Sequence, residues 1–232
     1  MLEGNHIKKA YFSMGCFWSV EALFDSLDGV VKTYVGYTGG NTLFPTYNSI
    51  GDHLETLEVY YDSSKTYNSI GDHLETLEVY YDSSKIAFEN LLTIFEKNHN
   101  YIVRPNLLQY YSAIFYNNEN EKELCLDWKK NKKEELKTEV LTRISPIEKF
   151  YYAEFYHQKY YVQLEPVIMS NLRSKFSTGN DLISSPLCHK LNVYLAGYGS
   201  LKELNKELED FNLSEDAKNR LLSIVEGFNN SK

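Results

Sequence analysis

The sequence predicts an α/β fold in which helices pack on one sheet, followed by a helical C-terminal extension. Strand and helix patterns alternate with short connections from residue 7 to about residue 144. Beyond residue 153 the patterns are helical only. A chain of 232 residues can build a substantial core. We therefore expect one domain over residues 1–232, with a core at about 7–165 and an extension at about 166–232.

Two periodicities locate the expected elements. Alternation of apolar and polar residues predicts strands at 7–12, 30–37, 111–116 and 139–144. Apolar residues at helical spacing predict helices at 16–27, 87–98, 119–138, 153–161, 187–195, 201–210 and 215–227. Gly29 is expected to end the first helix, and small polar residues predict a loop at 177–186.

Composition excludes several classes of protein. The net charge of −8 argues against nucleic-acid binding, which needs a basic patch. The only basic cluster, Lys129, Lys130, Lys132 and Lys133, precedes Glu134 and is interpreted as a solvated helix face. No apolar run is long enough to span a membrane, and the N-terminus lacks the pattern of a signal peptide. We expect a cytoplasmic protein that binds neither nucleic acid nor membrane.

An exact repeat interrupts the first half of the chain. Residues 46–65 and 66–85 carry the same twenty letters. Each copy contains one strand pattern, at 54–61 and at 74–81. Repeat architectures need several imperfect copies, so the pattern indicates a recent tandem duplication or an error in assembling the sequence.

Cys16 is the first candidate for chemistry. It follows Gly15 at the start of the first expected helix, where unpaired N–H groups and the helix dipole favour negative charge. Such a position is expected to lower the pKa of the thiol. Phe17 and Trp18 follow directly and could form an apolar pocket. On the residues alone, an inert buried cysteine and two core aromatic residues are the more common outcome.

A carboxyl on an apolar strand face is the second candidate. Alternation places Glu55 with Leu57 and Val59, and in the second copy Glu75 with Leu77 and Val79. Burial would favour the neutral carboxylic acid, which can act as a general acid. An exposed glutamate at the first residue of the strand is an equally good interpretation.

The other candidates carry weaker signals. Cys125 shares an expected helix face with Leu124 and Trp128, which indicates packing. Cys188 follows the expected loop and is interpreted either as a second thiol able to reach Cys16 or as a buried small residue. His157 is a lone histidine that nothing marks as a base. Three cysteines without zinc-type spacing argue against a disulfide framework or a metal site.

The motifs resemble those of peptide methionine sulfoxide reductases of the A type, which act on the S epimer. The matching segments follow the family order over most of residues 7–165, and they are Gly15-Cys16-Phe17-Trp18, Val35-Gly36-Tyr37-Thr38-Gly39-Gly40, Pro45-Thr46-Tyr47, Gly51-Asp52-His53-Leu54-Glu55, Gln109-Tyr110-Tyr111, Phe150-Tyr151-Tyr152-Ala153-Glu154 and Tyr156-His157-Gln158-Lys159-Tyr160. The stretch around Leu195-Ala196-Gly197 resembles the tail of insect members.

The resemblance implies a fold and a site. The fold would be a two-layer α+β sandwich around a mixed, ferredoxin-like sheet. Cys16 would attack the sulfoxide sulfur, and Glu55 or its copy Glu75 would protonate the oxygen. The remaining implied site residues are Tyr47 (or Tyr67) and Tyr110 at the oxygen, and Phe17 and Trp18 around the methyl group.

The resemblance also implies the reaction cycle. Cys16 would become a sulfenic acid, a second thiol would condense with it, and thioredoxin would reduce the disulfide. No metal or organic cofactor is needed. The substrate would be methionine sulfoxide, free or in proteins, in a protein repair reaction under oxidative stress, and we expect a monomer.

Three departures from the family pattern leave questions open. Only Cys188 stands where many members carry resolving cysteines, Arg104-Pro105-Asn106 replaces an Asp found in some members, and the repeat is additional. We favour the first copy as the strand, hence Glu55 over Glu75, because the extra residues would then leave at Lys65, far from the acid. The alternatives are a non-catalytic descendant that binds methionine sulfoxide at a blocked site, and a thiol peroxidase.

Overall fold

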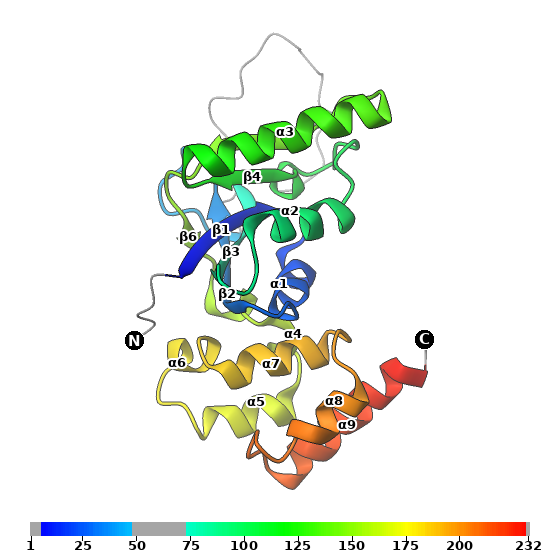
Figure 1. The fold of residues 1–232 in the computed structure, drawn as a ribbon. Coiled ribbons are helices and arrows are strands. Elements are labelled where there is room, and N and C mark those ends of the chain that lie inside the picture. Colours follow the sequence, from blue (N-terminus) through cyan, green and yellow to red (C-terminus); the bar gives the residue numbers. More distant parts are fainter. Residues whose placement is uncertain (1–5, 48–72, 231–232) are drawn as a thin grey trace.

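A computed structural model describes residues 6–47 and 73–230 of the chain. Figure 1 shows two parts, a sheet covered by helices and, beneath it, a bundle of helices. The sheet part contains the strands β1 (Ile7–Ser13), β2 (Val30–Thr38), β3 (Leu74–Asp82), β4 (Ala113–Tyr116), β5 (Arg143–Pro146) and β6 (Tyr151–Tyr152). Its helices are α1 (Phe17–Asp25), α2 (Phe88–Lys97) and α3 (Glu119–Leu136).

The sheet is mixed, as the family resemblance implies. The strand order is β5-β4-β1-β3-β2-β6. All neighbouring pairs are antiparallel except β4 and β5, which run parallel. β1 and β3 lie at the centre, so the residue that opens β3 and the loop that follows β1 meet at one end of the sheet.

One face of the sheet carries the main core. The side chains of Leu77 and Val79 point to this face and pack with Phe24 of α1, Leu91 of α2 and Cys125 of α3. The buried Cys125 confirms the packing role expected for it. On the second face, Ile147 and Phe150 pack against Tyr11, Leu74 and Phe115, and Tyr34 of β2 packs against the core of the C-terminal helices.

The C-terminal bundle has its own core. It contains α4 (Tyr160–Gln163), α5 (Pro166–Arg173), α6 (Gly179–Ile183), α7 (Pro186–Leu195), α8 (Leu201–Glu207) and α9 (Glu215–Asn230). Leu172, Leu191 and Leu221 are fully buried among these helices. α7 contacts α1 and β2, which attaches the bundle to the sheet part beside the first helix.

Two expected elements are corrected by the structure. The helix expected at 153–161 is instead a 3-10 turn at Phe155–His157 followed by α4, because Gln158 is extended and Lys159 has a left-handed φ of 50°. The loop expected at 177–186 contains α6, which Thr178 caps by accepting the N–H of Asp181 at 3.1 Å.

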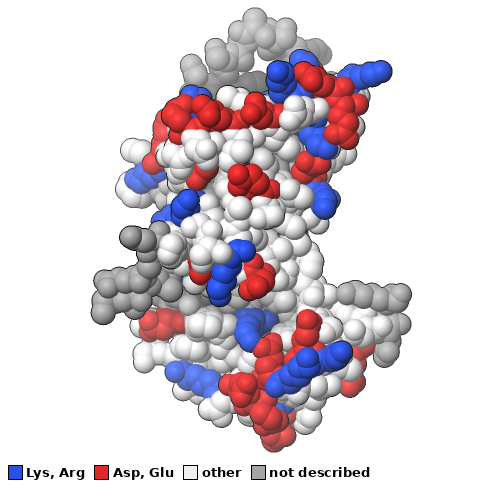
Figure 2. All heavy atoms as spheres, in the orientation of Figure 1, with Lys and Arg blue, Asp and Glu red and all other residues white. Residues whose placement is uncertain are grey.

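Charged side chains of both signs lie over the helices on the face drawn in Figure 2. Acidic residues form a band along much of α3, with basic residues toward one end, and both signs lie together over the lower helices. On α3, Lys132 pairs with Glu96 at 2.7 Å and with Glu135 at 2.7 Å. The lysine cluster is therefore part of a solvated, ion-paired helix face. In the part of the chain described, no helix is both long and apolar enough to cross a bilayer.

Candidate active site

Cys16 lies at the N-cap of α1, directly after β1 ends. Gly15 makes this turn with a φ of +93°, a conformation that strains any residue with a Cβ. The turn leaves Cys16 half-buried at the end of the sheet, with its thiol free. The sequence predicted this position from the Gly-Cys pair and the helix that follows.

The pKa of the Cys16 thiol differs from the expectation. Burial raises it above the ordinary value, although the N–H groups of Trp18 and Ser19 at the helix start act to lower it. The negative charge of Glu75 raises it further. The helix start therefore moderates the cost of a thiolate here but does not outweigh burial, which corrects the expectation of a lowered pKa.

Glu75, at the start of β3, places a buried carboxyl beside the start of α1. Its side chain is on the core face and only 1% exposed. One carboxylate oxygen accepts the N–H of Phe17 at 3.1 Å, and the other accepts Gln109 Nε2 at 2.9 Å. Burial raises the pKa of Glu75 to about 7, and the two hydrogen bonds oppose that rise. The carboxyl is thus poised to give up a proton near neutral pH.

The structure builds β3 from the second copy of the repeat, which corrects the preference for Glu55. Both copies end in the same residues, but only the second joins α2 directly. Asp82 N–H donates to Gly29 O at 2.8 Å, and Ile86 N–H donates to Asp82 O at 3.0 Å, which forms one short turn into α2. A first-copy strand would place twenty more residues in that turn. Glu55 and Tyr67 lie outside the described residues.

Tyr47 comes from the first copy and completes the site beside Glu75. Its hydroxyl hydrogen-bonds that of Tyr110, and both hydroxyls lie close enough to Cys16 and Glu75 for those charges to raise their pKa values, although burial is the larger cause. The backbone N–H of Tyr47 donates to Glu154 Oε1 at 3.0 Å. Both phenols stay protonated where the thiol and the acid meet, and because the Tyr47 O–H donates to Tyr110, the Tyr110 O–H is the one free to donate in this arrangement.

Phe17 and Trp18 form an aromatic wall next to Cys16. Phe17 is buried against Tyr37, with ring centroids 6.0 Å apart. Trp18 stacks on Tyr160 with centroids 3.7 Å apart, and its Nε1 donates to His157 Nδ1 at 3.0 Å. Because indole can only donate, His157 must carry its proton on Nε2, and burial lowers its pKa. The wall suits a small apolar group.

Sequence reasoning missed several residues of this site. His157 packs its ring 4.5 Å from that of Tyr47, so it contacts both the wall and the phenol pair. Tyr160, Gln109 and Glu154 hold Trp18, Glu75 and Tyr47 respectively. All four stand in segments that carry the family resemblance, but their residue types alone gave no role.

The structure does not bring Cys188 into the site. It lies in α7 with its side chain fully buried in the core of the helical bundle. Burial raises its pKa to about 12, and the charges that act on it are those of Lys159, Glu21 and Asp25. Pairing with Cys16 would require α7 to move, so the structure gives no support to Cys188 as the resolving thiol.

We predict that Glu75→Gln accelerates alkylation of Cys16. At pH 7.5 Glu75 is largely ionised, and its charge raises the pKa of the thiol. Removing the charge lowers that pKa, so the thiolate fraction grows and alkylation by iodoacetamide should speed up roughly three- to tenfold. Mass spectrometry of the labelled chain measures the rate. An equal or slower rate would show that Glu75 does not act on the thiol.

Comparison with known proteins gives concordant matches. A family model described as peptide methionine sulfoxide reductase matches residues 8–70 and 64–180, and each match contains one copy of the repeat. A peptide methionine sulfoxide reductase of Drosophila melanogaster is 36% identical over 207 residues, which is 88% of this chain and 75% of the relative. One from Methanosarcina acetivorans is 36% identical over 169 residues, 68% of this chain and 79% of the relative. The solved methionine sulfoxide reductase A of Corynebacterium diphtheriae shares the fold, with a TM-score of 0.54 at 24% identity over 72% of this chain and 79% of that one.

Proposed function

The chain belongs to the peptide methionine sulfoxide reductase family, and on that premise we propose that it reduces the S epimer of methionine sulfoxide at Cys16, with Glu75 as the acid. One observation carries the assignment. The Glu75 carboxyl, whose pKa burial raises to about 7, accepts the N–H of Phe17, the residue next to the nucleophile. The Glu75 carboxyl and the Cys16 thiol are thus held together beside the aromatic wall of Phe17 and Trp18.

The chemistry follows from these positions. The Cys16 thiolate attacks the sulfoxide sulfur while the Glu75 carboxyl gives its proton to the oxygen. Tyr47 and Tyr110 donate hydrogen bonds to the same oxygen, and Phe17 and Trp18 hold the methyl group. The S–O bond of the substrate breaks, the oxygen passes to Cys16 as a sulfenic acid, and methionine leaves, so the thiol is oxidised by two electrons and the sulfoxide reduced by two.

Recycling requires a thiol from outside the site. Cys125 and Cys188 are both fully buried. We propose that thioredoxin attacks the sulfenic acid directly, releases water, and resolves the mixed disulfide with its second thiol. The proposal includes a monomer acting in the reducing cytoplasm, where three free cysteines stay reduced.

A coupled assay tests this function. Thioredoxin, thioredoxin reductase and NADPH should support turnover of methionine-S-sulfoxide, with little or none of the R epimer. Faster turnover of hydrogen peroxide than of the sulfoxide would favour the thiol peroxidase instead. Binding of the sulfoxide without turnover would favour the non-catalytic descendant.

We predict that a single-copy variant keeps the activity. Deleting residues 48–67 leaves one complete copy, with Tyr47 and Glu75 retained. Tyr47 is held by Glu154, and Glu75 by Phe17 and Gln109, all outside the deletion. Shortening a connection changes closure entropy little, so kcat/KM should stay within about threefold. An increase above tenfold would instead show that the extra copy blocks the site.

A further inference from the structure

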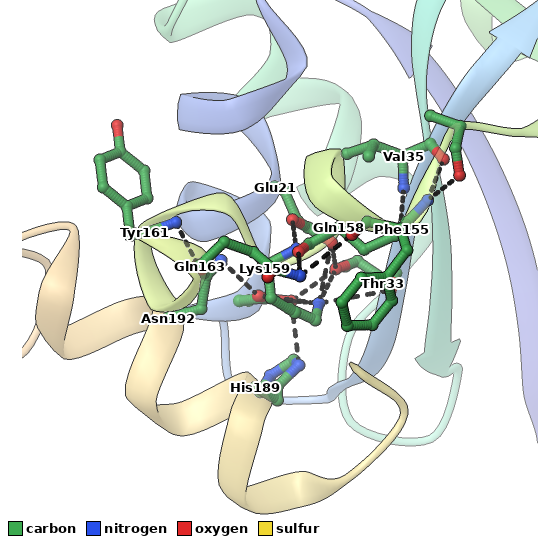
Figure 3. A network of polar contacts seen from close by, with 12 residues as sticks. Glu21, Thr33, Val35, Phe155, Gln158, Lys159, Tyr161, Gln163, His189 and Asn192 are labelled. Carbon is green, nitrogen blue, oxygen red and sulfur yellow. Dashed lines mark hydrogen bonds and ion pairs between the residues drawn. The ribbon is translucent and has the colours of Figure 1, made fainter. Parts of the chain in front are cut away.

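A buried network of charges lies between α1, β2 and the start of the C-terminal bundle (Figure 3). At its centre is the Lys159 ammonium, whose side chain is 2% exposed. It donates to Asp25 Oδ2 at 3.0 Å and to Thr33 Oγ1 at 2.6 Å, and it pairs with Glu21 Oε1 at 3.0 Å. None of these groups touches the reacting atoms, so the mechanism above leaves the network without a role.

The backbone of Lys159 is strained. Its φ of 50° is left-handed, which costs energy for a residue with a Cβ. The conformation is held from both sides, since the Lys159 N–H donates to Glu21 Oε2 at 2.7 Å and the preceding Gln158 binds Val35 N and O of β2. This strained residue is the point where the expected helix at 153–161 breaks.

The break decides where two site residues lie. His157 and Tyr160 flank Gln158 and Lys159, and both contact Trp18, one through the 3.0 Å indole hydrogen bond and one through the 3.7 Å stack. A regular helix through Lys159 would give these two rings a different spacing and direction. The orientation of Trp18 therefore depends on the turn that Lys159 fixes.

The C-terminal bundle closes the same network. Asn192 of α7 is fully buried, its Nδ2 donates to Asp25 Oδ2 at 3.2 Å, and its Oδ1 accepts the N–H of Tyr161 at 3.2 Å. His189, one turn earlier, places Nδ1 at 2.9 Å from Asp25 Oδ1. Tyr161 follows the residue that stacks on Trp18, so α7 holds the far end of the turn (Figure 3).

We propose that Lys159 and Asn192 are positioning residues that fix the orientation of Trp18 in the aromatic wall. The C-terminal bundle is then part of the substrate-binding apparatus. The inference rests on the proposed role of Trp18 as a wall of the methyl pocket. It assigns the bundle a task beyond stability, which is to keep the turn of residues 157–161 in the one conformation that aligns the wall.

The charges of the network explain why the variants must be chosen with care. Burial raises the pKa of both carboxyls, Asp25 and Glu21, and the positive charge of Lys159 opposes that rise, which in Asp25 it outweighs. Lys159 forms an ion pair with Asp25 at 3.0 Å and a second with Glu21 at 3.0 Å. Removing the ammonium leaves a buried carboxylate without a counter-charge, which can unfold a protein. Asn192→Ala removes no charge and leaves both ion pairs intact.

The experiment uses the full chain with Trp128→Phe, which leaves Trp18 as the only tryptophan. The variants are Asn192→Ala, Lys159→Ala and Lys159→Gln, in which the amide restores a donor. The control is Arg220→Met, which breaks the ion pair with Glu165 at 2.8 Å elsewhere in the bundle. Acrylamide quenching and near-UV circular dichroism report on Trp18, the coupled assay gives kcat and KM, and thermal unfolding gives Tm.

The proposal expects Asn192→Ala to expose Trp18 to the quencher and to raise KM for the sulfoxide, with kcat/KM falling roughly tenfold. Lys159→Ala should do the same more strongly, and Lys159→Gln should recover part of the loss. Arg220→Met should change neither reading. A lower Tm with unchanged quenching and unchanged KM in Asn192→Ala would overturn the proposal. This outcome decides the matter even if the Lys159 variants fail to fold. Quenching is measured without turnover, so it decides the positioning role even if the reductase assignment fails.

Discussion

Replacing Cys16 by serine is expected to abolish thioredoxin-coupled reduction of methionine-S-sulfoxide. A serine hydroxyl stays protonated at neutral pH, and its oxygen cannot accept the substrate oxygen as the cysteine sulfur does when it forms a sulfenic acid. Activity should fall to the background of the assay, because the proposed reaction requires the sulfur of Cys16 to accept the oxygen. The fold should be unaffected, since Cys16 makes no hydrogen bond that caps α1.

Cys125→Ser is the matched control for Cys16→Ser. It makes the same atom change in a cysteine that is fully buried in the main core, where burial raises the pKa of the thiol to about 12. Its cost should appear in Tm, with turnover retained in the folded fraction. Retained turnover in Cys16→Ser, or loss of it in Cys125→Ser at a temperature where the protein is folded, would contradict the assignment of the nucleophile.

The positions of the nucleophile and the acid follow from local patterns. A glycine before a helix start places Cys16 at the N-cap, and the period of two along β3 places Glu75 on the same face as Leu77 and Val79. Both patterns depend only on neighbouring residues, which is why the sequence predicts them. The mixed sheet and the places of Tyr47 and Tyr110 in one site involve distant segments, and these expectations came from the family resemblance. The hydrogen bond between the two tyrosines comes from the structure alone.

Other features depend on tertiary contacts that no local pattern carries. The copy that forms β3 is decided by the turn into α2, because the two copies are identical in sequence. The pKa of Cys16 is decided by how far the first turn of α1 is buried, not by the helix start alone. The break at Lys159 is decided by two carboxylates on α1, more than 130 residues earlier.

Glu75→Gln is expected to lower kcat/KM at pH 7.5 by roughly 10²- to 10⁴-fold, the range for loss of a general acid. The productive form of the enzyme has Cys16 as the thiolate and Glu75 protonated. Burial raises the pKa of Glu75 to about 7 and that of the Cys16 thiol above its ordinary value, so the acid ionises at a lower pH than the thiol. The wild-type rate should therefore rise with pH up to about 7, as the thiolate fraction grows. Above pH 7 it should stay level until the thiol ionises, because the protonated fraction of Glu75 falls as the thiolate fraction rises. The two titration steps are properties of the interacting pair Cys16 and Glu75.

The pH profile of Glu75→Gln separates loss of the acid from loss of structure. Without the carboxyl only the thiol titrates, so the small remaining rate should keep rising through pH 7 instead of levelling, while alkylation of Cys16 becomes faster. Glu78→Gln is the matched control on the same strand, because Glu78 is 2% exposed but bonds Tyr11 and Tyr152 on the opposite face. A break near pH 7 that persists in Glu75→Gln would assign that titration to another group. A comparable loss of kcat/KM in Glu78→Gln would show that the effect of Glu75→Gln comes from disruption of β3 rather than from loss of the acid.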